Sequence, residues 1–200
     1  MAIRNAWVLC PRNTGPVIGA AFAATLAKAQ DGDEGAFTCI FRDVQPVLVR
    51  YLRVVAPGAA DDVAGDTWLH VVDGLTGFRG DEAAFRAWLF TIARHRAVDR
   101  GRWRARHPTV ALEGSGAADR LTAPDAADVA LERIGTLAAL AAVAQLPPEQ
   151  AEIVMLRVVA GLDTRQVAQI TGKSAGAVRV AAHRGLRRLA SLASSTGVIT

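Results

Sequence analysis

The segment FRAWLFTIARHRAVDRGRWRAR, at residues 85–106, constrains what this chain can fold into more than any other stretch. Four apolar side chains in its first half repeat at the spacing of one helix face: Phe85, Trp88, Leu89 and Ile92. Its second half, residues 94–106, holds six arginines and one acid, Asp99. The first half therefore predicts a helix anchored in a core, and the second half predicts a surface that binds a polyanion.

Trp103 lies inside this cationic stretch, between Arg102 and Arg104 and beyond the apolar stripe. An aromatic ring among cations suits unstacked bases better than a duplex, because the bases of a duplex present no free faces. The preceding loop, residues 78–81, adds a second aromatic, a cation and a glycine. This composition is suited to holding a base that has been pulled from the stack.

The whole chain predicts an all-α fold of two small helical domains joined by a flexible linker, because no long stretch alternates apolar and polar residues with a period of two. In its first half, helices are expected over residues 17–30, 34–55, 61–74 and 82–104. Asp33 is the expected N-cap of the second helix, and Pro46 is expected to kink it.

A composition change in the middle of the chain predicts the domain boundaries. Residues 107–130 are acidic, rich in Gly, Ala and Pro, and without periodicity, which is typical of a flexible linker. The predicted N-terminal domain covers residues 17–106, after an extension over 1–16. The predicted C-terminal domain covers residues 131–200.

The C-terminal domain predicts a helix-turn-helix. A helix that starts at Pro148 ends at Gly161, and a capping box from Asp163 to Gln166 then opens a short helix over 164–171. A glycine turn at residues 172–174, with Ser174 as the next N-cap, leads into a basic helix. The small apolar residues expected to let the two helices cross closely are Val167, Ala168, Ile170 and Val178. The exposed cations expected to contact guanine or phosphate are Arg179, His183, Arg184, Arg187 and Arg188.

Other features argue against enzymes, metal sites and membrane spans. Cys10 and Cys39 are too few for a disulfide framework or a metal site, which fits a reducing, cytoplasmic compartment. The acid pairs at 61–62 and 81–82 are explained more simply as helix caps than as a catalytic set. We expect no cofactor and no metal, because the four histidines lack ligand spacing. No apolar run spans a membrane, and Lys28 interrupts the only candidate signal cleavage site.

Four segments, in the same order, closely resemble the extracytoplasmic-function group of bacterial sigma factors over roughly residues 20–192. They are AQDGDEGAFTCIF, DDVAGDTWLHVV, FRGDEAAFRAWLFTIARHRAVDRGRWRAR and LPPEQAEIVMLRVVAGLDTRQVAQITGKSAGAVRVAAHRGLRRL. The resemblance implies an RNA polymerase subunit whose N-terminal domain reads and melts the −10 promoter element. Its C-terminal domain would read the −35 element as duplex. The implied partners are core RNA polymerase (the clamp helices of its largest subunit and the flap), promoter DNA and a cognate anti-sigma factor, without membrane insertion.

The resemblance also implies roles position by position. The polymerase-binding helix carries Asp62, Asp66, Leu69 and His70. The loop that captures a flipped −10 base comprises Phe78, Arg79, Gly80 and Asp81. The melting helix carries Arg94, His95, Arg100, Arg102 and Arg104, to which we add Trp103 from its place among the arginines. The −35 helix carries Ser174, Arg179, His183, Arg184 and Arg187.

The sequence departs from the family pattern at several of these places. Gly65 replaces a common Gln on the polymerase-binding helix, and His95 replaces a common Asn on the melting helix. Val180 and Ala181 replace a common Ser-Arg pair. Gly185 replaces the usual Ala, which we expect to cost about 1 kcal/mol of helix stability.

Two other readings compete with a sigma factor. A helix-turn-helix regulator that binds duplex DNA would explain residues 136–200 but would leave the Arg- and Trp-rich helix without a role. A helical adaptor or anti-factor that binds only protein would not need the net charge of +5 over residues 94–106. Co-purification with core polymerase distinguishes the first reading from a sigma factor, and salt-dependent DNA binding distinguishes the second.

Overall fold

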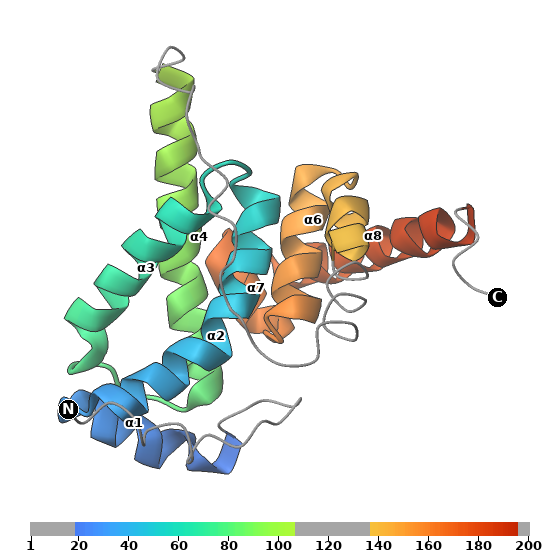
Figure 1. Cartoon of the computed structure of the whole chain (residues 1–200). Coiled ribbons are helices and arrows are strands. Elements are labelled where there is room, and N and C mark those ends of the chain that lie inside the picture. The colour runs from blue at the N-terminus through green and yellow to red at the C-terminus, as the bar shows by residue number, and fades with distance from the viewer. Residues whose placement is uncertain (1–18, 107–136, 196–200) are drawn as a thin grey trace, which may run out of the picture.

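The structure, a computed structural model, describes residues 19–106 and 137–195. Within these two ranges every regular element is a helix, which confirms the all-α prediction (Figure 1). The predicted linker over 107–130 and the extension over 1–16 lie outside the described residues, as does Cys10. No helix in the described ranges is both long enough and apolar enough to cross a membrane.

The N-terminal unit, as we call residues 19–106, contains a 3-10 turn (Gly19–Ala21) followed by α1 (Phe22–Gln30), α2 (Glu34–Val55), α3 (Ala60–Leu75) and α4 (Glu82–Arg106). The Asp33 carboxylate accepts a hydrogen bond from the backbone N–H of Ala36 at 3.0 Å, which confirms the predicted N-cap of α2. Of the helix predicted over 17–30, residues 17 and 18 lie outside the described range, and residues 19–21 form the 3-10 turn. The fourth continues to Arg106 rather than ending at 104.

An apolar core formed by α1, α2, α3 and α4 holds the N-terminal unit together. Phe85 and Leu89 of α4 are fully buried, as predicted, whereas Trp88 and Ile92 are half-buried. The Phe85 ring contacts Phe22 of α1, with 5.6 Å between the ring centroids. This core fixes the first half of α4, so the position of its cationic end follows from the packing of its apolar end.

The C-terminal unit, as we call residues 137–195, contains a helix over 137–144, then α6 (Pro148–Val154), α7 (Thr164–Thr171) and α8 (Ala175–Ser195). A π-helical segment, Met155–Val159, continues α6, and the N–H of Ala160 donates to the carbonyl of Met155 at 2.9 Å. Gly161 follows with a positive φ of 70°, and it ends this helix as predicted.

Local hydrogen bonds build the helix-turn-helix as predicted. The Asp163 carboxylate accepts from the N–H groups of Arg165 and Gln166, and the Gln166 side chain accepts from the N–H of Asp163 at 2.8 Å. Gly172 is left-handed at the end of α7, with a φ of 69°. The Ser174 hydroxyl accepts from the N–H of Ala177 at 3.1 Å and thereby caps α8. Of the four small apolar residues predicted to lie where these two helices cross, Val167, Ile170 and Val178 are buried and Ala168 is half-buried.

The two units pack directly against each other. The α6 helix and its π-helical continuation contact α2, and α7 contacts α4. The cationic end of α4 extends beyond the other helices at the top of Figure 1. The far end of α8 projects at the right of the same view.

Candidate nucleic-acid interface

The loop between α3 and α4 is held by aromatic packing at Phe78. Its ring stacks on Trp88 with centroids 5.1 Å apart, and it meets Phe85 edge-on at 5.5 Å. Phe78 is therefore half-buried, with part of its ring committed to the core. The side-chain amide of Gln30, at the end of α1, donates to the carbonyls of Leu75 and Phe78. Sequence reasoning missed Gln30, because no local pattern shows that α1 ends beside this loop.

Hydrogen bonds and close contacts hold the backbone of the rest of the loop, residues 79–81. The Arg79 guanidinium donates to the carbonyls of Thr76 and Phe78 at 2.9 and 2.7 Å, yet the residue remains exposed. A Cβ atom on Gly80 would lie 2.8 Å from the Ala84 Cβ and 3.0 Å from the Phe78 ring, so a side chain would displace the loop. The Asp81 carboxylate accepts from the N–H of Ala84 at 2.8 Å, which confirms the cap expected there.

The predicted melting helix carries its arginines on α4, and three of them have partners from elsewhere in the chain. Arg94 donates to Glu152 of α6 at 2.8 Å, and Arg100 donates to Asp62 of α3 at 2.7 Å. Arg96 contacts the imidazole of His70. His95 and Arg102 are exposed, and the Arg102 guanidinium lies 4.0 Å from the carboxylate of Asp99 on the same helix. The structure places Arg104 within α4, but its side chain lies outside the described atoms.

Trp103 lies near the end of α4 with 39% of its surface exposed. The guanidinium of Arg100 lies over its ring, 5.6 Å from the centroid, in a cation–π contact. Arg100 also donates a hydrogen bond to Asp62. Asp62 of α3 therefore helps to orient the guanidinium that lies over the Trp103 ring. An amphipathic ring next to arginines provides a surface on which an unstacked base can lie.

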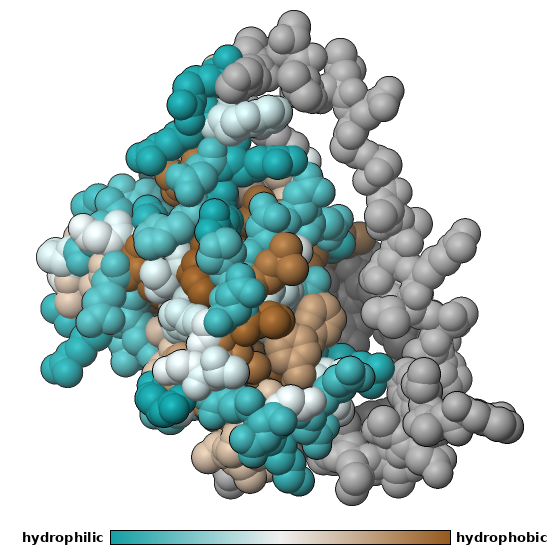
Figure 2. Space-filling view, turned by 90° about the vertical axis from the view of Figure 1, so that its left-hand side faces the viewer, coloured by the Kyte–Doolittle hydropathy of each residue, from teal (hydrophilic) through white to brown (hydrophobic). Residues whose placement is uncertain are grey.

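The α3 helix presents the four residues assigned to polymerase binding on an exposed face: Asp62, Asp66, Leu69 and His70. Leu69 is 66% exposed and Val72 is 52% exposed, which is unusual for large apolar side chains so near each other. Figure 2 views the molecule from the α3 side of Figure 1, and apolar surface there is surrounded by hydrophilic side chains. The sequence did not lead us to assign Val72 to this face, although Val72 follows Leu69 by three residues, a spacing that places both on one side of a helix.

The cap expected from the acid pair at 61–62 is wrong. The N-cap of α3 is Ala59, without a side-chain hydrogen bond, because both acids lie inside the first helical turn. Asp62 is the ion-pair partner of Arg100 instead. Both acids line a hollow between α3 and α4, with Gly65, Asp66, Leu69 and Arg100 as the other lining residues.

The assigned side chains of α8 lie on its accessible surface. Ser174, Arg179, His183, Arg184 and Arg187 are all exposed. The Ser174 hydroxyl is used as an N-cap. The buried residues on the other side of α8 include Val178, Ala181 and Gly185, which hold it against the rest of the unit. Ala181, one of the departures from the family pattern, is therefore a packing residue, whereas Val180 is 50% exposed.

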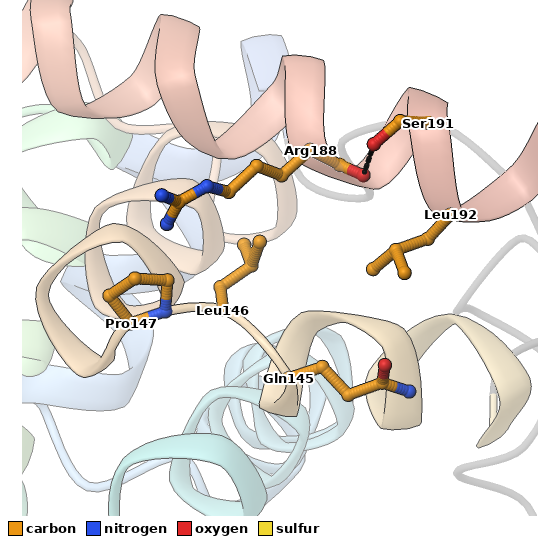
Figure 3. Close-up of a pocket in the computed structure, with 6 residues that line it drawn as sticks. All are labelled: Gln145, Leu146, Pro147, Arg188, Ser191 and Leu192. Atoms are coloured by element: carbon orange, nitrogen blue, oxygen red, sulfur yellow. Dashed lines mark hydrogen bonds between the residues drawn. The ribbon is translucent and has the colours of Figure 1, made fainter.

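Arg188, the fifth cation of this helix, also contacts the α6 side of the unit. It donates to the side-chain carbonyl of Gln150 at 3.2 Å. Figure 3 shows Arg188 and Leu192 pointing from α8 toward the turn at residues 145–147, across a hollow that these residues line. Among the described residues no group of His, Cys, Asp and Glu side chains is arranged to hold a metal ion.

Comparison with known proteins gives matches to both units. Residues 40–107 match the family described as Sigma-70 region 2, and residues 136–189 match Sigma-70, region 4. The ECF RNA polymerase sigma factor SigD of Mycobacterium tuberculosis is 35% identical over 176 residues, covering 83% of this chain and 81% of that protein. The ECF RNA polymerase sigma factor ShbA of Streptomyces griseus is 35% identical over 184 residues, covering 85% of this chain and 94% of that protein.

Solved structures show the same fold. CnrH, solved in complex with the cytosolic domain of CnrY, is 23% identical with a TM-score of 0.56, over 87% of this chain and 97% of that one. RpoE from Bartonella quintana, solved with the anti-sigma factor NepR, is 22% identical with a TM-score of 0.58, over 79% of this chain and 96% of that one.

Proposed function

This chain belongs to the extracytoplasmic-function (ECF) RNA polymerase sigma factors, and we propose that its N-terminal unit opens the −10 element while its C-terminal unit reads the −35 element as duplex. Its function is to direct promoter-specific transcription. The two units correspond in this proposal to a −10 domain over residues 17–106 and a −35 domain over 131–200. Residues 107–130 would form the flexible linker.

The contact between α3 and α4 carries this proposal. One helix exposes apolar Leu69 beside acids, which suits a protein partner, and the other exposes arginines and Trp103, which suit nucleic acid. The Asp62–Arg100 ion pair joins the two surfaces. A subunit that holds DNA against polymerase needs these surfaces side by side. A dimeric helix-turn-helix regulator has no use for either of them.

In the −10 domain, we assign base capture to the loop at residues 78–81 and strand binding to α4. The proposal assigns stacking to Trp103 and to the exposed part of Phe78, at roughly 1–3 kcal/mol per base. Opening a run of base pairs costs about 1.4 kcal/mol per step on average. A few stacking contacts therefore cannot open several base pairs alone, and the polymerase contacts of α3 must supply the remainder.

In the −35 domain, we assign base and phosphate contacts to the exposed face of α8. The capped start of this helix and its burial along Val178 and Gly185 support the assignment, because they hold the arginines on a rigid element. Each lost base contact should cost about 1–3 kcal/mol of discrimination. We also assign contacts with the polymerase flap to this domain.

The remaining assignments concern partners and location. The related CnrH was solved with the cytosolic domain of CnrY, and RpoE was solved with the anti-sigma factor NepR. We propose that a cognate anti-sigma factor also binds this chain and inhibits it. We propose that the chain has no catalytic activity of its own, because polymerase performs the chemistry. It would act in the cytoplasm, where polymerase and the chromosome are found.

In vitro transcription with core polymerase over a promoter library tests the proposed function. The expected result is initiation that depends on both the core enzyme and the −10 and −35 sequences. Duplex binding without co-purification of core polymerase would instead identify a helix-turn-helix regulator. Absence of any salt-dependent DNA binding, with or without the core enzyme, would identify a protein-binding adaptor.

A further inference from the structure

A side chain of α1 joins two backbone carbonyls of the turn that follows α3, those of Leu75 and Phe78. The α3 helix ends at Leu75, whose carbonyl also accepts from the backbone N–H of Phe78 at 3.1 Å. The side-chain nitrogen of Gln30 lies 2.8 Å from the Leu75 oxygen and 2.9 Å from the Phe78 oxygen, and it donates to both. A glutamine amide has two N–H groups, so its donor capacity is fully used here.

These two bonds tie the loop to the end of α1, which lies 45 and 48 residues earlier in the chain. The Phe78 carbonyl also accepts from Arg79 at 2.7 Å, so Gln30 and Arg79 share one acceptor. A fixed Phe78 carbonyl fixes the direction in which the next residues leave it. Gly80, which has no room for a side chain against Phe78, follows directly.

We propose that Gln30 is a positioning residue for the −10 loop, acting through the backbone of residues 75–78 without touching DNA. The inference rests on the proposed function of the loop. Gln30 holds the backbone on both sides of the turn, at Leu75 and Phe78, so it would fix the position of the loop residues that we assign to base capture. Loss of its two N–H donors should therefore change base selection more than it changes folding.

Two substitutions remove the donors while keeping the side-chain length. Gln30→Met is neutral, and like glutamine it is a good helix former. Gln30→Glu places a carboxylate against two carbonyl oxygens and should displace the loop further. The matched control is Gln45→Ala, because Gln45 is also a half-buried glutamine of the N-terminal unit, and it accepts from the indole of Trp68 at 2.6 Å, away from the loop.

The assay is transcription by the holoenzyme from promoters that share one −35 element and differ at single −10 positions. We expect the Gln30 variants to lose about tenfold in −10 discrimination, as for one lost base contact, with −35 preference unchanged. Equal −10 discrimination in wild type, Gln30→Met and Gln30→Glu would overturn the inference, as would the same loss in Gln45→Ala. If wild type itself shows no −10 dependence, the proposed function fails rather than the role of Gln30.

A second, independent observation concerns the contact between the two units. The Glu152 carboxylate of α6 accepts from Arg94 of α4 at 2.8 Å and from the Tyr51 hydroxyl of α2 at 3.3 Å. The side chains of Arg94 and Glu152 are 25% and 18% exposed, so the ion pair is partly shielded from solvent. Near the start of α4, the Gln166 side chain donates to the carbonyl of Ala83 at 3.0 Å.

This arrangement is incompatible with simultaneous occupation of both promoter elements. The −10 and −35 elements lie roughly 25 base pairs apart, which is about 85 Å along B-DNA at 3.4 Å per step. In the structure, the unit assigned to −35 contacts the unit assigned to −10 directly. Glu152 also occupies Arg94, one of the cations assigned to the melted strand, as a phosphate would.

We infer that Glu152 is an internal latch, which closes the free protein by substituting for DNA phosphate at Arg94 and releases when polymerase separates the units. This inference also rests on the assigned role of Arg94. The test variant is Glu152→Gln, which keeps the shape of the side chain and removes its charge. The matched control is Glu149→Gln, because Glu149 of the same helix pairs at 3.1 Å with Lys173 inside the C-terminal unit.

Small-angle X-ray scattering and binding of a fluorescent single-stranded −10 oligonucleotide test the latch in the full-length free protein. We expect Glu152→Gln to increase the radius of gyration and to bind the oligonucleotide about fivefold tighter than Glu149→Gln. Equal behaviour of the two variants would overturn the latch, and so would expansion without tighter binding. If wild type with core polymerase fails to bind the oligonucleotide, the proposed function of the unit is at fault.

Discussion

Replacement of Gly185 by alanine should destabilise the C-terminal unit, although alanine is the better helix former. Gly185 lies inside α8 where this helix crosses α6. A Cβ atom at this position would lie 2.7 Å from Cγ2 of Val154 and 3.5 Å from Cβ of Gln150. Carbon atoms pack best at roughly 3.5–4.0 Å, so the first of these contacts is too short by about 0.8 Å.

The magnitude follows from two opposing effects. An alanine in the helix interior gains about 1 kcal/mol over glycine. Val154 is 3% exposed, and as a β-branched residue in a helix it has one strongly preferred rotamer, so it cannot turn away. Overpacking of this kind costs typically about 1–3 kcal/mol. The net effect on the free energy of unfolding should therefore lie between about zero and a loss of 2 kcal/mol.

Urea unfolding of matched variants measures this balance. Gly65→Ala is the control, because Gly65 lies inside α3 with no atom within 4 Å of its missing Cβ, and this variant should be stabilised. Adding Val154→Ala to Gly185→Ala should give a loss smaller than the sum of the two single losses. If Gly185→Ala raised the unfolding midpoint as much as Gly65→Ala does, the close approach of α6 and α8 would not be the reason for glycine here.

Further predictions concern promoter binding and pH. Simultaneous replacement of Arg179, His183 and Arg184 of α8 by alanine should remove the −35 preference of the holoenzyme in transcription assays. An unchanged −35 preference would contradict the assignment. Charge reversal at Asp62 and Asp66 should abolish −10 opening with core enzyme, measured by permanganate reactivity of promoter thymines; thymine reactivity with the isolated protein would refute the dependence on polymerase. Burial, with a smaller contribution from Glu152, raises the pKa of Tyr51 well above 10. The folded state therefore retains the proton that the unfolded chain loses, so stability should fall as pH rises above about 10, and Tyr51→Phe should flatten that fall in unfolding titrations.

The helices and their ends could be predicted because the interactions that set them are local. The caps at Asp33 and Ser174 and the capping box that starts at Asp163 join residues three or fewer positions apart, so a short window contains both partners. Apolar spacing also identified Phe85 and Leu89 as core. The N-cap predicted from the acid pair on α3 was wrong by only a few residues, because the helix begins after Ala59. The partner of Asp62 could not be predicted locally, because it lies on another helix.

The sequence by itself determined the helical pattern, the cationic stretches and the order of the segments, since each depends on neighbouring residues. Only the tertiary structure decided which side chains meet across helices. It brings Glu152 to Arg94, Gln30 to the Phe78 carbonyl, and α6 so close to α8 that Gly185 cannot carry a side chain. The physical reason is that such contacts depend on the packing of whole helices, which places residues tens of positions apart within a few ångströms.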